Sequence, residues 1–319
     1  MKHLLRILPI TLLAVACNDE IEHGAPIIGF DAQAEHTRAV ADISSLQANG
    51  FSVWGGYEGT TVFDGRKVSY ASGAWTYDNP EVWVLDKEYH FFALYPFETI
   101  ASVATFKQSG EEYDVYQIKY TVPDDASTDL LTAFRTVETD NVEALNNPVN
   151  LQFSHVLTRI NIKIEKNEVN KANKIVIKEV TLGGVWKTGT LNTSRHQEYD
   201  DNWDFSGSTT TSFMETTTTE LSKGSNDAKA ILTDLLLIPQ KIGQQKIPLY
   251  LKYEFYDSET NTLQNTINAT AYLPMGEWMA GKIYTYTIVL AAEDMEIKIT
   301  TPTVESWGDD VPSGTIIIQ

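Results

Sequence analysis

The sequence predicts an all-β protein built from two antiparallel β-sandwich domains in tandem. Short apolar or alternating segments recur along almost the whole chain, and turn residues such as Asn, Asp, Gly and Pro separate them. Helical periodicity is nearly absent, whereas Thr, Val and aromatic residues, which favour strands, are frequent. The 319 residues suffice for two domains of about 150 residues each.

The first half of the chain supplies the elements of the predicted first domain. Residues 27–30 are expected to form a short apolar strand, and residues 31–41, which lack core-facing periodicity, an exposed loop. Residues 42–48 are expected to form one or two helical turns that end at Asn49-Gly50. Apolar or alternating segments that stop at turn residues predict further strands at 51–54, 67–72, 75–77, 89–95 and 113–122.

The second half continues the strand pattern after a break. The polar run Asn146-Asn147-Pro148 marks the expected boundary between a first domain, 27–148, and a second domain, 149–319. Residues 193–228 are polar, and their Thr-rich part, 209–219, is expected to form an edge hairpin or a mobile loop. Strands are predicted at 151–157, 159–166, 175–182, 230–239, 247–256, 266–273, 281–291, 296–300 and 314–319.

The N-terminus explains the only cysteine of the chain. Lys2 and Arg6 precede an apolar run that is too short to span a bilayer and that ends at Ala16-Cys17. This arrangement resembles the signal peptide of a bacterial lipoprotein, in which the cysteine thiol is acylated, for example with palmitate. It predicts a signal peptide at 1–16, lipidation of Cys17 and a polar tether at 17–26. The alternative is an ordinary secretory peptide that happens to contain Cys17.

Composition excludes several classes of function. The net charge of −19 argues against nucleic-acid binding, which needs clustered Lys and Arg, and one cysteine excludes an intrachain disulfide and Cys-based metal sites. The six histidines are scattered without catalytic or metal-binding spacing, so we expect no enzyme, no catalytic residue, no cofactor and no metal. Three acidic pairs in turns offer oxygen ligands for Ca²⁺, although solvated turn residues are the simpler interpretation: Asp124-Asp125, Asp200-Asp201 and Asp309-Asp310.

Aromatic, Gly and Pro residues follow one another in a characteristic order along the chain. The order begins with Thr37-Arg38-Ala39 and ends with Trp307-Gly308; between them come 51–57, 75–83, 91–96, 129–133, 153–159, Pro239 and 276–286. Together with the lipoprotein signal, this order resembles the fimbrillin-like, or Mfa-like, lipoproteins of Bacteroidales, which include the subunits of type V fimbriae.

The resemblance implies a fold, a function and a set of partners. It implies that the two sandwiches are transthyretin-like and that the protein is a structural subunit, or pilin, of a surface fimbria. Such subunits are exported as outer-membrane lipoproteins, held by their lipid, and an Arg-specific protease then removes the N-terminal segment with its first strand. The C-terminal strand of a neighbouring subunit fills the groove by donor-strand exchange. Partners are therefore other fimbrial subunits, the protease and a host or bacterial surface receptor.

Three groups of residues would carry this mechanism. Cleavage after Arg38 would give a new N-terminus at Ala39 and release the displaced strand, whose candidate residues are Ile27, Ile28 and Phe30. The candidate donor strand is Thr315, Ile316, Ile317 and Ile318, preceded by a hinge at 312–314. The alternatives are that Arg38 is an ordinary loop residue and that the tail completes its own C-terminal sandwich.

Other functions stay open at this point. The protein could be a fimbrial anchor that keeps Cys17, a tip adhesin, or a non-polymerising surface lipoprotein that binds glycans. The sequence predicts that His155 and four tryptophans lie in the core; a sugar-stacking platform is the alternative for these tryptophans, which are Trp54, Trp75, Trp83 and Trp278.

Overall fold

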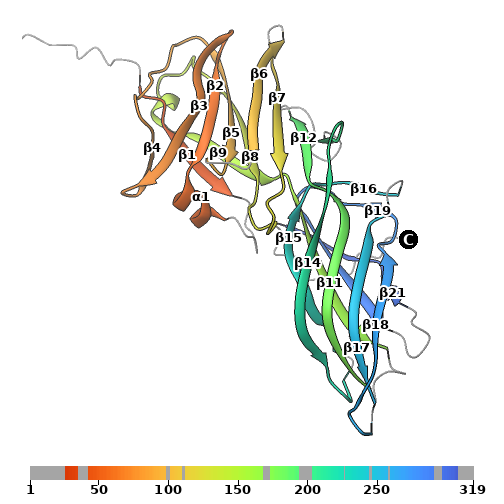
Figure 1. The fold of residues 1–319 in the computed structure, drawn as a ribbon. Helices are drawn as coiled ribbons and strands as arrows, with labels where there is room; N and C mark the ends of the chain where they lie inside the picture. The colour runs from red at the N-terminus through yellow and green to blue at the C-terminus, as the bar shows by residue number, and fades with distance from the viewer. Residues whose placement is uncertain are drawn as a thin grey trace, which may run out of the picture.

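The computed structural model describes residues 26–34, 42–97, 101–109, 112–167, 173–193, 203–225, 227–243, 246–257, 259–290 and 297–307. Within these ranges the chain forms twenty-two strands and two short helices, which confirms the all-β prediction. Figure 1 shows two β-rich lobes arranged along an elongated molecule, the first in orange to yellow and the second in green to blue. The tandem transthyretin-like arrangement stays a prediction.

A seven-stranded sheet forms most of the first lobe, in the order β1-β9-β8-β5-β2-β3-β4. Neighbouring strands are antiparallel except β1 and β9, which run parallel. The two edge strands, β1 and β4, contact each other, so the sheet curls around its own aromatic core. The strands are β1 (Phe30–Ala34), β2 (Phe51–Tyr57), β3 (Thr60–Ala71), β4 (Ala74–Thr76), β5 (Glu88–Tyr95), β8 (Leu131–Glu138) and β9 (Val149–His155).

A smaller sheet of four strands joins the first lobe to the second half of the chain. Its order is β13-β12-β7-β6, and β12 pairs with β7 from Thr188 opposite Thr121 to Thr193 opposite Tyr116. The strands are β6 (Ala101–Ser109), β7 (Glu112–Thr121), β12 (Thr188–Thr193) and β13 (Trp203–Asp204).

Two sheets enclose the core of the second lobe. The first has the order β15-β10-β20-β21, with β22 also paired to β20, and the second has the order β14-β11-β17-β18. β16 (Lys241–Ile242) and β19 (Gly276–Glu277) form a separate two-stranded ladder. The other strands are β10 (Thr158–Lys166), β11 (Lys174–Trp186), β14 (Thr210–Leu221), β15 (Lys229–Leu237), β17 (Pro248–Tyr256), β18 (Leu263–Tyr272), β20 (Lys282–Leu290), β21 (Ile297–Ile299) and β22 (Thr303–Ser306).

Two short helices interrupt the strands. α1 (Ile43–Asn49) begins after Asp42, whose carboxylate accepts a hydrogen bond from the Ser45 N–H at 3.0 Å, and ends at Gly50, which has a φ of 72°. This helix confirms the expectation for residues 42–48. The second helix is the 3₁₀ turn η1 (Ala144–Asn146).

The structure differs from the sequence-based expectations at several segments. Strands β6, β8, β12 and β22 were not predicted, and only Phe30 of the predicted strand 27–30 belongs to a strand, β1. Residues 31–34 were expected in a loop but continue β1, because polar Asp31 and Gln33 alternate with buried Ala32. The Thr-rich segment is neither loop nor hairpin but one long strand, β14, at the edge of its sheet.

Strand pairing also crosses the expected domain boundary after Pro148. β9 follows this boundary, yet it pairs with β1 and β8 of the first sheet, and β12 pairs with β7. Division of the chain at residue 148 thus remains a prediction, and the two lobes share strands from both sides of it.

A buried cluster connects the end of the first sheet to the second lobe. His155, the last residue of β9, hydrogen-bonds through Nδ1 to the Asp129 carboxylate at 2.8 Å. The indole of Trp307, which follows β22, stacks on the His155 ring with centroids 4.2 Å apart. All three side chains are buried, as the sequence predicted for His155. Of the four tryptophans expected in the core, Trp83 and Trp278 are buried, and Trp54 and Trp75 are half-buried against the cores.

Candidate functional site: the N-terminal strand and the groove that it fills

The candidate site is the place where the N-terminal segment, residues 26–34, enters the first lobe. Its side chains alternate between the core and the surface: Ile28, Phe30 and Ala32 are 0%, 4% and 3% exposed, whereas Ile27 is 59% exposed. In an extended chain, residues two apart share a face. The segment therefore presents three apolar side chains to the lobe.

An aromatic cage, defined as Phe63, Tyr77 and Phe91, surrounds Phe30. The centroid of the Phe30 ring lies 5.2 Å from that of Phe63 and 5.6 Å from those of Tyr77 and Phe91, edge to face in each case. Phe63 belongs to β3, Phe91 to β5, and Tyr77 follows β4. Since each such pair contributes about 0.5–1.5 kcal/mol beyond the buried area, Phe30 is the main anchor of the segment.

On one side, the backbone of the segment pairs with β9. The parallel ladder runs from Phe30 opposite Val149 to Ala34 opposite Phe153. The N–H of Val149 also donates to the carbonyl of Gly29 at 2.8 Å. This is the only full ladder of β1, because β1 stands at the edge of the described sheet.

On the other side, the segment makes a shorter contact. The N–H of Ile28 donates to the Glu81 carbonyl at 2.8 Å, and the N–H of Trp83 donates to the Pro26 carbonyl at 3.1 Å. These bonds surround an isolated bridge between residues 27 and 82. The segment thus closes the gap between β9 and residues 81–83.

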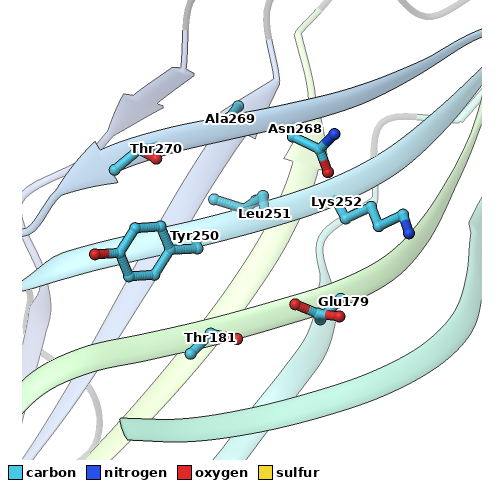
Figure 2. A pocket seen from close by; sticks show the side chains of 8 residues that line it. All are labelled: Glu179, Thr181, Tyr250, Leu251, Lys252, Asn268, Ala269 and Thr270. Atoms are coloured by element: carbon cyan, nitrogen blue, oxygen red, sulfur yellow. The ribbon is translucent and has the colours of Figure 1, made fainter.

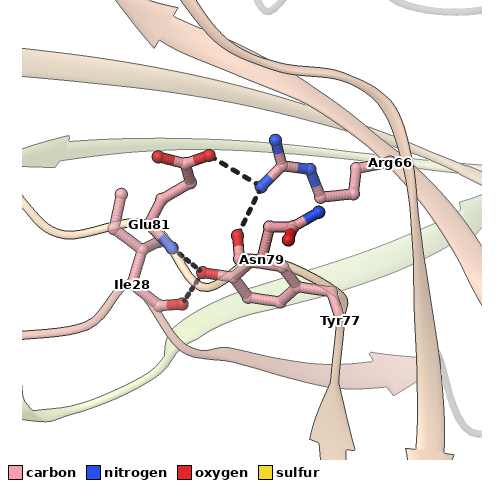
Figure 3. Close-up of polar contacts among 5 residues, drawn as sticks. All are labelled: Ile28, Arg66, Tyr77, Asn79 and Glu81. Atoms are coloured by element: carbon pink, nitrogen blue, oxygen red, sulfur yellow. Dashed lines mark hydrogen bonds and ion pairs between the residues drawn. The ribbon is translucent and has the colours of Figure 1, made fainter.

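Figure 3 shows the polar cluster that receives the segment. The Tyr77 hydroxyl donates to the Ile28 carbonyl at 2.6 Å and accepts from the N–H of Glu81 at 3.2 Å. The Arg66 guanidinium donates to the Asn79 carbonyl and to the Glu81 carboxylate, both at 2.9 Å. Burial raises the pKa of Tyr77, so its hydroxyl remains a donor at neutral pH. Only Ile28 of these residues belongs to the segment, so the lobe itself supplies a binding site for a strand carbonyl.

Only some of the site residues predicted from the sequence lie in the described part of the chain. Ile28 and Phe30 point into the groove, and Ile27 lies at the surface. Ala32 was missed, although the alternation of residues 28, 30 and 32 was a signal for it. The residues predicted for lipidation, cleavage and strand donation lie outside the described residues; they are Cys17, Arg38, Ala39, Thr315, Ile316, Ile317 and Ile318.

Two features of other kinds of site are absent from the described ranges. No group of three or more His, Cys, Asp or Glu side chains there is close enough to hold a metal ion. No helix in the described part of the chain has the length and apolar character needed to cross a bilayer.

Solved structures share this fold. A fimbrial protein from Bacteroides vulgatus has a TM-score of 0.66 at 22% identity, and the match covers 88% of this chain and 99% of that one. A proposed cell adhesion protein from Bacteroides ovatus has a TM-score of 0.52 at 17% identity, covering 89% of this chain and 98% of that one. No curated protein matches the chain in sequence. The fold is therefore one found in a protein of bacterial fimbriae.

The family follows from the sequence itself. Residues 37–307 match the fimbrillin-like family. Because this match spans most of the chain, the protein belongs to that family. This confirms the resemblance drawn from the aromatic, Gly and Pro residues. Membership implies a cell-surface location and association with other fimbrial subunits.

Proposed function

We propose that the protein is a structural subunit of a surface fimbria that polymerises by donor-strand exchange. In this proposal the chain is exported as an outer-membrane lipoprotein acylated at Cys17, and an Arg-specific protease cuts between Arg38 and Ala39. The observation that carries the proposal is the edge strand β1, whose buried side chains enter the first lobe a few residues before Arg38.

Cleavage after Arg38 would remove the whole N-terminal segment. The aromatic cage around Phe30 and the free side of β9 would then face water. Exposed apolar surface and unpaired backbone groups are both unfavourable, and a single incoming strand satisfies both, through ladder bonds and through alternate side chains. A strand from a neighbouring subunit would therefore be retained in the groove.

The C-terminal tail is the proposed donor. Its residues 315–318 are β-branched and favour an extended chain. Because side chains alternate along a strand, Ile316 and Ile318 would share the face that Ile28 and Phe30 now present to the groove. Thr315 and Ile317 would face away from it.

Proteolysis followed by electrophoresis tests the proposal. The purified protein is treated with an Arg-specific protease, its new N-terminus is read, and the product is run on a denaturing gel without heating. We expect an N-terminus at Ala39 and a ladder of multimers, because exchanged strands resist detergent until they are heated. A cut at Ala39 that leaves only monomers at every protein concentration would contradict strand exchange.

Three variants serve as controls. Arg38→Ala should block both the cut and the ladder, whereas Arg195→Ala, which removes another arginine, should change neither. Removal of residues 314–319 should allow the cut but abolish the ladder. For the lipoprotein step, a palmitate analogue should label the wild-type protein in cells and leave Cys17→Ser unlabelled; equal labelling would exclude Cys17 as the acylated residue.

A further inference from the structure

Two tyrosines are unusually exposed on the second lobe. Tyr250 and Tyr272 are 47% and 53% exposed, more than any other aromatic side chain whose exposure the structure describes. Tyr250 lies on β17 and is paired with Thr270 of β18, two residues before Tyr272. Both rings therefore stand on the same outward face of the β14-β11-β17-β18 sheet, opposite its buried face.

A hollow of about 380 Å³ lies beside Tyr250 on this face (Figure 2). In Figure 2, Tyr250 and Lys252 extend in opposite directions along β17, and Glu179, Thr181, Asn268 and Thr270 lie on the neighbouring strands. The strand register arranges the outward side chains in two rows across β11, β17 and β18, which are Thr181–Tyr250–Thr270 and Glu179–Lys252–Asn268.

Gly183 makes room for the Tyr250 ring. It follows Thr181 by two residues on β11, so it belongs to the same face of the sheet. A Cβ atom at Gly183 would lie 3.2 Å from Cε2 of Tyr250 and 3.2 Å from Cγ of Pro248, closer than an ordinary van der Waals contact. Glycine weakens the interior of a strand, and here it allows the ring to approach the backbone closely.

The second row offers free hydrogen-bonding groups. Within the described part of the chain, the side chains of Glu179, Lys252 and Asn268 make no hydrogen bond or ion pair with another residue. They comprise a carboxylate acceptor, an ammonium donor and an amide that both donates and accepts. Glu179 and Lys252 stand opposite each other across the ladder, so their charges offset locally.

We propose that this hollow binds a neutral sugar. Pyranose rings carry apolar C–H groups, so C–H groups at one end of the sugar contact Tyr250, while hydroxyls at its other end bond to Glu179, Lys252 and Asn268. A platform with a few convergent polar groups is the usual composition of a small-molecule site, and 380 Å³ falls within the common range of roughly 300–1,000 Å³. Because the charges of Glu179 and Lys252 offset each other, the hollow offers no net positive charge to an acidic sugar.

The hollow is open, so a single site binds weakly, with a dissociation constant in the millimolar range. It belongs to the second lobe and shares no residue with the aromatic cage, so binding to one chain is independent of strand exchange. Repetition of the site along a fibre would strengthen attachment by avidity, and only this last step rests on the proposed function.

Saturation-transfer NMR with the purified protein tests this site. The probes are the methyl glycosides of galactose and glucose, N-acetylglucosamine and, as the acidic comparison, N-acetylneuraminic acid. At least one neutral sugar should bind with a Kd of about 1–10 mM. Tyr250→Ala should raise this Kd at least about tenfold, and Tyr250→Phe, which keeps the ring, should retain most of the binding.

Two further variants and a melting curve complete the test. Gly183→Ala should weaken binding severalfold by displacing the ring, whereas Leu263→Ala, at the other end of β18, should leave it unchanged. A thermal melt of each variant confirms that it is folded. Three results would overturn the proposal: no neutral sugar binds at about 50 mM, the acidic sugar binds better, or folded Tyr250→Ala binds as the wild type does.

Discussion

The segment around β1 and the strand β10 both bury apolar side chains in a core, but they are held by different numbers of neighbouring strands. Each presents three alternating apolar side chains to a core: Ile28, Phe30 and Ala32 in the first lobe, and Ile160, Ile162 and Ile164 in the second. β10 has full ladders on both sides, with β15 and β20. The β1 segment has one full ladder and a single bridge.

The difference shows which strand can leave without unfolding its lobe. Removal of β10 would break its sheet in the middle and separate β15 from β20. Removal of the β1 segment would break one edge ladder and uncover a groove whose walls remain connected through β9, β8 and β5. Burial alone does not distinguish the two strands; the number of neighbours does.

The largest expected effect on folding distinguishes β10 from the β1 segment. Ile162→Asp places a charge in the middle of the second lobe and should prevent its folding, because an unpaired buried charge costs many kcal/mol. Ile28→Asp should instead release only the N-terminal segment and leave both lobes folded. Hydrogen exchange followed by mass spectrometry measures this, and global loss of protection in Ile28→Asp would refute the comparison.

The second prediction concerns the anchor of the segment. Phe30→Ala should weaken attachment of the segment in the uncleaved chain by about 3–5 kcal/mol, because it empties the aromatic cage. After cleavage the same substitution should have no effect on the multimers, since the residue has gone. Proteolytic sensitivity of the segment and the melting temperature of the multimers report the two effects. A change in the multimers would mean that the segment stays bound.

The third prediction uses pH to test the polar cluster. Burial raises the pKa of Tyr77 above its ordinary value of 10, so the unfolded chain loses this proton first as pH rises. Stability contributed by Tyr77 is then complete below about pH 10 and falls above it. Tyr77→Phe should cost about 0.5–1.5 kcal/mol at pH 8, and less at pH 11. Urea titration at both pH values measures this, and an equal cost at both would contradict it.

The last prediction concerns the helix cap. Hydrogen bonds from Ser44 and Ser45 lower the pKa of Asp42 below 3.8. This contribution to stability is therefore present above about pH 4 and is lost as pH falls further. Asp42→Ala should cost about 1 kcal/mol at pH 7 and less as pH falls below about 4, as measured by denaturant unfolding, and Asp42→Asn, which can still cap, should cost less than Asp42→Ala at pH 7. A cost of Asp42→Ala that does not fall with pH would contradict this account.

Period-two patterns identified most strands because they report which face of a strand is buried. The short apolar run at 27–30 identified Ile28 and Phe30, but the small side chain of Ala32 and its polar neighbours made the rest of β1 resemble a loop. Phe63 was likewise outside any predicted strand, so the full aromatic cage was not foreseen.

Such patterns do not predict which strands pair with each other. An alternating strand fits any neighbour with a suitable face, so the parallel pairing of β1 with β9 and the pairing of β12 with β7 depend on the whole fold. The same reason explains why the hollow beside Tyr250 was missed: Thr181, Tyr250 and Thr270 meet only through strand register.

Disulfide trapping would test strand exchange most directly. Cys17 is the only cysteine and would leave with the cleaved segment, so the processed chain offers a clean background. Val149, opposite Phe30 in the ladder, is replaced with cysteine together with Ile316 or Ile318. After cleavage and mild oxidation, these pairs should give disulfide-linked multimers, whereas Val149→Cys with Ile317→Cys should not. Linkage confined to monomers, or none at all, would show that the tail does not occupy the groove of a neighbouring subunit.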